Sequence, residues 1–549
     1  MSLINKKFLC YIFCIATHGC LADVPDREKI LHTMKTASEF MLEKASYQGG
    51  FVWSYLPDFS RQWGELEAKR TMIWLQPPGT ASVGHLMLDA YHATGDEFYY
   101  QGAQKIATAI IYAQHPSGGW NYVADYAGET SLKDWYATIG KHAWRLEEFH
   151  HYYGNATFDD AGTVDAAKFL LRLYMEKRDE QYRGPLNKAI DFVLNSQYPI
   201  GGWPQRFPLM YDHPYPDHPD YSSFITFNDD VAIENIDFLL MCYQTLGETR
   251  VREPIIRAMN TFIVTQQGQP QPGWALQYTI ELQPAAARSY EPRSLHTPTT
   301  ARNITQLIKF YRLTGDSKFL ARIPEALDWL ESLKVTSTSV IEGRTHPAFI
   351  EIGTGKAIYT HRRGSNVANG NYYLDYLPGN MLAHYKSAAS IPIDKLRKAY
   401  RDVLAIPTID VGRNSPLREM VRMELPEYFT LGRVSFSDLN FRAQSERAKN
   451  DEESLEKRVG KLIGELNASG YWPTPLFFTT NPYIGQPPKR KNASNDSRYA
   501  NSMVGDKWDT SPYPVDNPVM GISTGAYIRN MGVLIRYLTE NVSVKAGVK

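Results

Sequence analysis

The segment GGWPQ at residues 201–205 belongs to a recurring element from which the fold can be predicted. Related segments are GGFVW at 49–53, GGWNY at 118–122 and PGWAL at 272–276. After a polar loop, each is followed by an amphipathic stretch that ends in a tyrosine: Tyr91, Tyr174, Tyr243 and Tyr311. Similar segments recurring about every 70 to 80 residues indicate a repeated supersecondary unit.

Stretches between these segments, such as LNKAIDFVLNSQ at 186–197, have apolar residues three and four positions apart and predict helices. Each unit is therefore a helix, a Gly-Trp loop and a second helix. Repeated around an axis, such units form an α/α toroid, a mainly all-α fold of helix hairpins, with the loops on one rim. We expect Trp120, Trp203 and Trp274 to pack between repeats, and sugar stacking is the alternative.

The chain divides into five predicted regions. After residues 1–22, an α/α-repeat catalytic core covers 23–335. Residues 336–385, rich in β-branched residues and glycine, predict an extended or β excursion, near 336–375, that completes the cleft. Residues 386–458 carry charge runs typical of a surface or linker region. Residues 459–549 repeat the helix, Gly-aromatic, helix order, place Tyr537 like the earlier tyrosines, and are expected to complete the toroid.

The first 22 residues are predicted to be a secretory signal peptide, so we expect a secreted or periplasmic protein. Lys6 and Lys7 precede an apolar run, and a Cys-x-Ala sequence ends at Ala22. Lipidation of Cys20 is the alternative. The mature chain then keeps only Cys242 and has no internal disulfide, so a large core must stabilise it.

Net charge and hydropathy limit the classes of binding partner. The 59 basic and 59 acidic residues give a formal net charge of zero, which argues against a nucleic-acid binder. No later stretch is apolar over about 18 residues, so no membrane span is expected. An acidic polymer can still be bound by a local cluster of arginine, lysine or metal, and we expect a monomer.

Two helix starts on the predicted rim carry paired acids, in ATFDDAGT (156–163) and ITFNDD (225–230). The four carboxylates are those of Asp159, Asp160, Asp229 and Asp230. One aspartate at a helix start is typical of an N-cap. A second carboxylate beside it adds repulsion unless a cation relieves it. Oxygen ligands without nearby cysteine or histidine favour calcium over zinc, and the sequence leaves open which of the paired acids bind the ion.

Several segments, in order, resemble the signature segments of the family 10 polysaccharide lyases, the α/α-toroid pectate lyases. They are GGWNY with ATFDDAGT, then GGWPQRFP, ITFNDD, PAAARSYEPRSL and PAFIEIGTGKAIYTHRRG. The resemblance implies a lyase that cleaves 4-linked uronate polymers, with polygalacturonate or pectate expected and ulvan or glucuronan as alternatives. It implies a calcium ion on the two pairs of acids and Arg288 as the catalytic base. The expected substrate-binding residues are Trp203, Arg206, Tyr290 and Arg362.

The chain departs from the family pattern around this centre. Asn121-Tyr122-Val123 stands where a lysine-containing stretch is usual, and Ala161 stands where an acid or glycine is common. No second arginine follows Arg362 in NVANGNYYLDY. The catalytic centre therefore resembles the family's, whereas the outer subsites differ.

The chemistry is consistent with this interpretation. Elimination removes the C5 proton beside a uronate carboxylate, and a cation held by Asp159 and Asp229 would neutralise that carboxylate while a base takes the proton. Arg288 is alternatively a charged stabiliser of the developing enolate, or a structural partner of Glu291. Two other classes stay open: a glycoside hydrolase using Asp159 with Asp230 or Glu291, and a non-catalytic glycan-binding protein.

Overall fold

The computed structural model describes most of the chain. The described residues are 25–210, 219–363, 371–382, 385–413, 415–417, 425–430, 440, 454–487 and 505–546. The predicted signal peptide, residues 1–22, and the alternative lipidation site Cys20 lie outside these residues. Cys242 is buried and unpaired.

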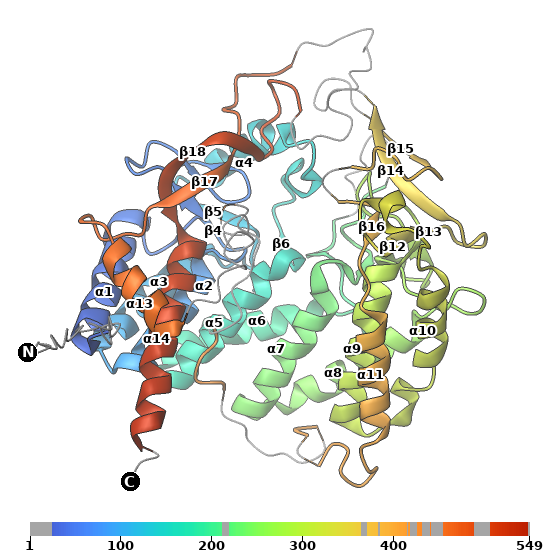
Figure 1. The fold of residues 1–549 in the computed structure, drawn as a ribbon. Helices are drawn as coiled ribbons and strands as arrows, with labels where there is room; N and C mark the ends of the chain where they lie inside the picture. Colours follow the sequence, from blue (N-terminus) through green and yellow to red (C-terminus); the bar gives the residue numbers. More distant parts are fainter. Residues whose placement is uncertain are drawn as a thin grey trace, which may run out of the picture.

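The described chain is mainly helical, with hairpins of helices in sequence order (Figure 1). The first helices are α1 (Arg27–Phe40), α2 (Thr80–Thr94), α3 (Glu97–Ala113), α4 (Glu129–Thr138), α5 (Gly162–Lys177), α6 (Arg183–Ser196) and α7 (Val231–Leu246). They are followed by α8 (Arg252–Val264), α9 (Thr297–Thr314), α10 (Ile323–Ser332), α11 (Ile393–Leu404), α13 (Leu455–Glu465) and α14 (Thr524–Ala546). Helices α14, α2, α5 and α7 pack in that spatial order, which confirms the predicted α/α toroid.

The Gly-Trp loops have the same local structure in successive units. The indole N–H groups of Trp120, Trp203 and Trp274 donate to the carbonyls of Ile110, Val193 and Phe262, each at 2.8 Å. These carbonyls lie near the end of the preceding helix, and the three tryptophans are fully buried. The prediction that they pack between repeats is therefore confirmed.

Glycine is required at the start of two of these loops. Gly118 and Gly201 have φ of 107° and 108°, a conformation that side chains rarely adopt. A Cβ added at Gly118 would also lie 2.1 Å from the Lys188 carbonyl, and one at Gly201 would lie 2.2 Å from the Arg257 carbonyl. The next hairpin's outer helix therefore approaches each loop too closely for any other residue.

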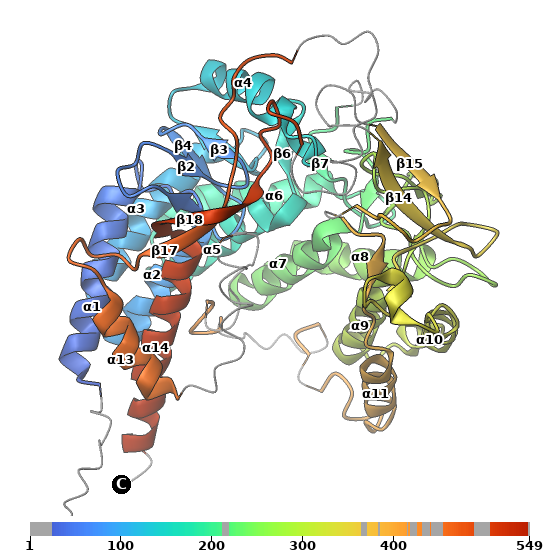
Figure 2. The ribbon, with the colours of Figure 1, turned by 45° about the horizontal axis from the view of Figure 1, so that its top comes forward.

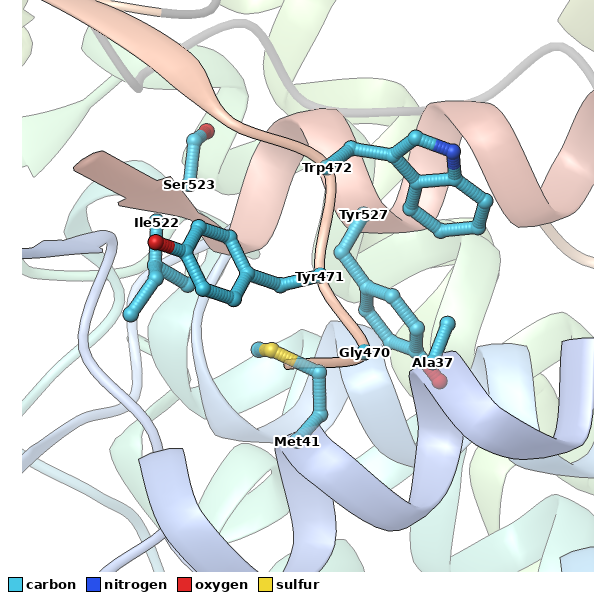
Figure 3. Close-up of a pocket in the computed structure, with 8 residues that line it drawn as sticks. All are labelled: Ala37, Met41, Gly470, Tyr471, Trp472, Ile522, Ser523 and Tyr527. Carbon is cyan, nitrogen blue, oxygen red and sulfur yellow. The ribbon is translucent and has the colours of Figure 1, made fainter. Parts of the chain in front are cut away.

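A fifth unit of the same kind lies near the C-terminus. Trp472, after α13, donates its indole N–H to the Leu462 carbonyl at 2.8 Å. Figure 3 shows the loop at Gly470 and Tyr471 seated between α1 and α14, where Met41, Tyr471 and Tyr527 surround a small pocket. Helix α14 packs on α1, α2 and α13, so the two ends of the chain form one part of the core.

Short strands join neighbouring units along the rim. Strand β6 (Ala156–Thr157) pairs with β7 (Arg206–Phe207), and β8 (Ile225–Thr226) pairs with β9 (Gln277–Tyr278). Each pairing ties the strand before one helix start to the Gly-Trp loop of the next unit. Figure 2 shows β6 and β7 beside the upper ends of α5 and α6. The rim is therefore held in register from one unit to the next.

The predicted excursion after α10 contains short strands, as expected. These are β12 (His346–Pro347), β13 (Phe349–Ile350), β14 (Ala357–Arg363) and β15 (Asn371–Asp375). Strand β13 pairs with β11 (Leu295–His296) at the start of α9, and β14 pairs antiparallel with β15. The excursion is thus anchored to the rim of the fourth unit.

The range predicted to be a charged linker also contains packed structure. Helix α11 packs on α9 and α10. Farther along, Asp89 of α2 is fully buried and accepts bonds from the backbone N–H groups of Phe429 and Thr430, at 3.0 and 2.8 Å. Arg172 of α5 binds the same carboxylate at 2.6 Å. Residues 425–430 are therefore fixed to the inner helices.

No helix in the described part of the chain is long and apolar enough to cross a bilayer.

Candidate active site

The two predicted acid pairs lie on matching turns at the starts of α5 and α7. The turns are η4 (Asp159–Ala161) and η6 (Asn228–Asp230). Asp160 and Ala161 in the first, and Asp229 and Asp230 in the second, have φ between 48° and 58°. Such left-handed conformations cost about 1 to 3 kcal/mol each and cluster at functional sites. The repeat has kept a strained turn at both places.

The turns bring three of the four predicted acids together. Asp159, Asp160 and Asp229 each offer a carboxylate oxygen, and these oxygens lie within 4.8 Å of one another. Asp230 is turned away and pairs with Arg302 at 3.0 Å, in a position where both side chains are about 40% exposed. Asp230 therefore does not join the cluster, which corrects the prediction of four clustered acids.

Asp159 is the buried member of the cluster. Its Oδ2 accepts hydrogen bonds from the Tyr122 hydroxyl, from Gln205 Nε2 at 3.0 Å and from Arg288 Nη2 at 3.0 Å. Burial opposes ionisation, but Arg288 and these hydrogen bonds outweigh it, so the pKa of Asp159 lies below its ordinary value. Asp159 is thus held as a carboxylate.

The other two members carry the electrostatic cost. Burial, followed by the Asp159 carboxylate, raises the pKa of Asp160 and of Asp229 well above the usual value. Asp160 has a single donor among the described residues, Gln76 Nε2 at 2.6 Å. Two neighbouring carboxylates therefore favour the neutral form unless a cation is present.

The cluster fits a hard divalent cation. Within the described part of the chain, Asp159 Oδ1 and Asp229 Oδ2 are buried and accept no hydrogen bond. A buried carboxylate oxygen without a donor is costly, and a metal ion would satisfy it. The oxygen-only donor set suits calcium. Asn228, which occupies the position of Asp159 in the second turn, lies 3.5 Å from Glu291 instead.

Arg288 lies in the middle of the carboxylates and is 3% exposed. Its Nε donates to Glu148 at 3.0 Å, Nη2 to Asp159 at 3.0 Å and Nη1 to Glu291 at 3.3 Å. Burial disfavours its charge, but Glu148 and Glu291 outweigh it and raise the pKa of Arg288 well above its ordinary value. In this arrangement Arg288 is a cation. The predicted pairing with Glu291 is present, together with three further acids, Glu148, Asp159 and, at 3.8 Å, Asp229.

Glu148 is the main residue that sequence reasoning missed. It is 3% exposed, and burial raises its pKa to about 8 despite the nearby Arg288. The neighbouring Glu147 is equally buried and accepts from the Ser289 N–H at 3.1 Å. Both follow α4, in a segment without a counterpart in the other units. Two adjacent acids between apolar Leu146 and Phe149 are the only sequence signal that was available.

The predicted substrate-binding side chains lie deeper than expected. Trp203 is 0% exposed and has no face open to a sugar ring, so its predicted stacking role is wrong. Tyr290 is 1% exposed, and its hydroxyl donates to the Arg145 carbonyl at 2.8 Å. Arg206 is 2% exposed, with its guanidinium 5.1 Å from the Tyr122 ring and 4.7 Å from the Tyr153 ring.

Arg362 is 3% exposed, and its guanidinium lies 4.0 Å from the ring of Trp144. Burial lowers the pKa of Arg362 to about 10. Two of the four predicted substrate-binding residues lie near the acid cluster. Arg206 contacts Tyr122, whose hydroxyl donates to Asp159, and Tyr290 is two residues after Arg288 in the sequence. Trp203 belongs to the hydrophobic core.

Comparison with known proteins shows a family similarity over part of the chain. The model of the pectic acid lyase family matches residues 132–359, which contain both acid turns and Arg288. The match covers less than half of the chain, and it indicates a polysaccharide lyase. No curated protein matches the sequence of this lyase.

Several solved structures are similar to the lyase. A family 10 polysaccharide lyase from Cellvibrio cellulosa has a TM-score of 0.40 and 16% identity, covering 58% of this chain and 95% of that chain. A family 76 α-mannanase from Bacteroides thetaiotaomicron has 0.38 and 8%, covering 95% and 98%. A cellobiose 2-epimerase from Spirochaeta thermophila has 0.32 and 12%, covering 69% and 96%.

Proposed function

We propose that the lyase cleaves 4-linked uronate polymers, with polygalacturonate or pectate as the main substrate, by cation-assisted β-elimination. The observation that carries this proposal is the cluster of Asp159, Asp160 and Asp229 beside Arg288, with two buried carboxylate oxygens that accept no hydrogen bond from the described residues. A calcium ion bound there would act as a Lewis acid toward the uronate carboxylate and make the C5 proton more acidic.

Under this proposal, Asp159 and Arg288 have different roles in the reaction. Asp159 is held ionised and oriented by Tyr122 and Gln205, so it keeps the site negative enough for a cation. Arg288, our candidate for the catalytic base, lies 3.0 Å from Asp159 and so within reach of a uronate bound at the cluster. In its charged form it would instead stabilise the negative charge that develops on the enolate. The carboxylates around it favour that second role until a cation competes for them.

A glycoside hydrolase is the second candidate, but the site favours it less. A hydrolase needs two carboxylates with substrate or water between them. Asp159 and Glu291 both bind Arg288, at 3.0 and 3.3 Å, so a guanidinium occupies the space between them. Asp230 pairs with Arg302 on the exposed side. Neither predicted pair is free to act on a glycosidic bond.

Ultraviolet absorbance tests the proposal. Elimination leaves a conjugated, unsaturated uronate that absorbs, whereas hydrolysis gives reducing ends without new absorbance. We expect absorbance to rise with polygalacturonate and calcium, to stop with chelator and to return with added calcium. Pectin, alginate, glucuronan and ulvan in the same assay would identify another uronate polymer. Reducing ends without absorbance would establish the hydrolase instead.

We further propose that residues 1–22 direct export and that the mature lyase acts as a monomer outside the cytoplasm. An extracellular polymer requires an exported enzyme, and the signal-like sequence supports this. Mass spectrometry of the protein recovered from culture medium or periplasm tests the cleavage after Ala22. Light scattering of the same sample tests the monomer.

A further inference from the structure

The residue that lies four positions before the first threonine of an inner helix is equivalent in the first two units. In the first unit this residue is Gln76, before Thr80 of α2, and in the second it is Asp159, before Thr163 of α5. The two threonines make the same contact, because each hydroxyl oxygen accepts a backbone N–H of its own Gly-aromatic loop, at 3.0 and 2.9 Å. Gln76 is therefore the first unit's counterpart of Asp159.

These equivalent positions also have equivalent neighbours in the next unit. The second acid of the third unit, Asp229, offers an oxygen within 4.8 Å of Asp159 in the second unit. In the same way, the second acid of the second unit, Asp160, lies against Gln76 of the first unit, with 2.6 Å between Asp160 Oδ2 and Gln76 Nε2. The row of acids along the rim therefore ends at an amide, which donates to the last carboxylate instead of repelling it.

Two tryptophans fix the direction of this amide, which is 1% exposed. The Trp74 indole N–H donates to Gln76 Oε1 at 2.8 Å, and the Trp53 indole N–H donates to the Gln76 backbone carbonyl at 3.0 Å. Both indoles are buried, and their ring centroids are 5.9 Å apart. Because an indole N–H can only donate, Oε1 must face Trp74 and the NH2 group must face the acids.

The NH2 group of Gln76 bridges two carboxylates from different units. Nε2 donates to Asp160 Oδ2 at 2.6 Å and to Glu65 Oε2 at 3.1 Å. Glu65 belongs to the turn between β2 (Gln62–Trp63) and β3 (Glu67–Ala68). A primary amide has two N–H bonds, so each carboxylate can take one of them. Asp160 is thus held in one orientation by a neutral donor whose own direction is fixed.

We propose that Gln76 is a positioning residue of the cation site, which binds Oδ2 of Asp160 and so turns Oδ1 toward the ion. This rests on the proposed function, because it requires a cation at Asp159, Asp160 and Asp229. Hydrogen-bond partners of metal ligands orient those ligands, and their loss weakens metal binding by about 10- to 100-fold. Gln76 lies outside residues 132–359, which match the pectic acid lyase family. The first unit would therefore complete a site whose ligands all come from later units.

Calcium binding by Gln76→Met tests this role. Methionine has nearly the same length as glutamine but donates no hydrogen bond. Calorimetry on chelator-treated protein without substrate gives the calcium Kd, and the Tm in chelator shows whether the variant is folded. We expect Kd to rise about tenfold or more. Gln76→Asn keeps an amide but is one methylene shorter, so it cannot span Trp74 and Asp160 and should also weaken binding. Trp74→Phe removes only the indole N–H and should raise Kd by a smaller factor.

Gln114→Met is the matched control. Gln114 follows α3 and is partly buried, and its Nε2 donates to the backbone carbonyls of Gly118 and Pro185, at 2.8 and 2.9 Å. This variant loses two hydrogen bonds without losing contact with an acid, so its calcium Kd should equal that of the wild type. An unchanged Kd in the folded Gln76 variants would overturn the positioning role. An equal rise in Gln114→Met would overturn it as well, because general loosening of the fold would then explain both.

Failure of the proposed function gives a different pattern. If calcium produces neither binding heat nor a rise in Tm in the wild type, the cation site is absent and the positioning role falls with it. If the wild type binds calcium and Gln76→Met binds it with the same Kd, only the positioning role fails. Gln76-dependent calcium binding in a protein that releases no unsaturated product from any uronate polymer would support the positioning role and refute the lyase reaction.

Discussion

The neighbouring residues Asp229 and Asp230 give a sharp test of the cation site. Asp229 is within 4.8 Å of Asp159 and Asp160, whereas Asp230 pairs with Arg302 at 3.0 Å. Asp229→Asn and Asp230→Asn therefore make the same chemical change one residue apart. We expect only the first to remove calcium binding. Both turns keep their left-handed backbone, because asparagine tolerates that conformation as well as aspartate does.

The size of the effect follows from linkage. At a calcium concentration of 100 times Kd, the wild type gains about 2.7 kcal/mol of stability. If losing one of three carboxylates weakens binding by about 100-fold, the gain at the same concentration falls to about 0.4 kcal/mol. Asp230→Asn should keep nearly the full gain. Its pair with Arg302 is exposed, and such pairs contribute about 1 kcal/mol or less.

Without calcium, the sign of the Asp229 effect reverses. Burial and the carboxylates of Asp159 and Asp160 raise its pKa in the folded protein well above the unfolded value. Such a group stabilises the fold below its unfolded pKa and loses that contribution as the pH rises through the raised folded pKa. At neutral pH, Asp229 therefore lowers the stability of the folded protein when no cation is bound. Asp229→Asn should melt at the same temperature as the wild type in chelator, or higher.

Thermal unfolding with and without calcium, followed by the absorbance assay, measures both effects. The expected pattern is a calcium-induced rise in Tm for the wild type and Asp230→Asn, with little rise for Asp229→Asn. Activity should follow the same division. The reasoning fails if Asp229→Asn keeps the wild-type rise, or if Asp230→Asn loses it.

Three further predictions concern Arg288, Glu148 and the core residue Trp203. Arg288→Ala should lower kcat by about 100-fold or more with the fold intact. If Arg288→Lys is active and loses this activity as the pH drops below neutral, a base at this position is favoured. More than a tenth of wild-type activity in Arg288→Ala would contradict both the base and the charged stabiliser. Burial raises the pKa of Glu148 to about 8, so its contribution to folding stability is lost as the pH rises from about 4 to about 8. In chelator, the Tm of Glu148→Gln should therefore fall less than that of the wild type across this range. Trp203→Ala should cost about 3 to 5 kcal/mol in urea unfolding yet leave KM unchanged where it is folded, since Trp203 is fully buried.

The repeat made much of the fold predictable from sequence. Gly-aromatic loops and recurring tyrosines fix the order of helices, because each unit repeats the same local contacts. The Tyr91, Tyr174 and Tyr311 carbonyls each accept, at 2.7 Å, from a left-handed residue that ends the helix. Placement of both acid pairs on one rim followed from the same logic. Equivalent positions in a toroid converge whatever the intervening loops contain.

Side-chain direction was not predictable in the same way. Asp229 and Asp230 are adjacent in sequence, and the left-handed turn at both residues sends one to the cluster and the other to Arg302. Arg302 lies in the next inner helix, so this choice depends on packing between units. Glu148 could not be placed either, because its segment is unique to one unit and reaches Arg288 across the rim. Non-repeated segments carry no positional information.

The arrangement around Arg288 is the physical argument for the proposed cation. Five carboxylates, those of Asp159, Asp160, Asp229, Glu148 and Glu291, surround one guanidinium. Removing charges from water is costly, and one arginine balances only one of the five. The fold tolerates the remainder because the Gly-Trp loops and inner helices form a continuous buried core beneath the rim. Protons on Asp160, Asp229 and Glu148 relieve part of the repulsion. A divalent ion held by Asp159, Asp160 and Asp229 would relieve more, and it would compete with Arg288 for Asp159. A substrate carboxylate would then meet an arginine with fewer acidic partners, so under the proposed function cation binding and catalysis would be coupled.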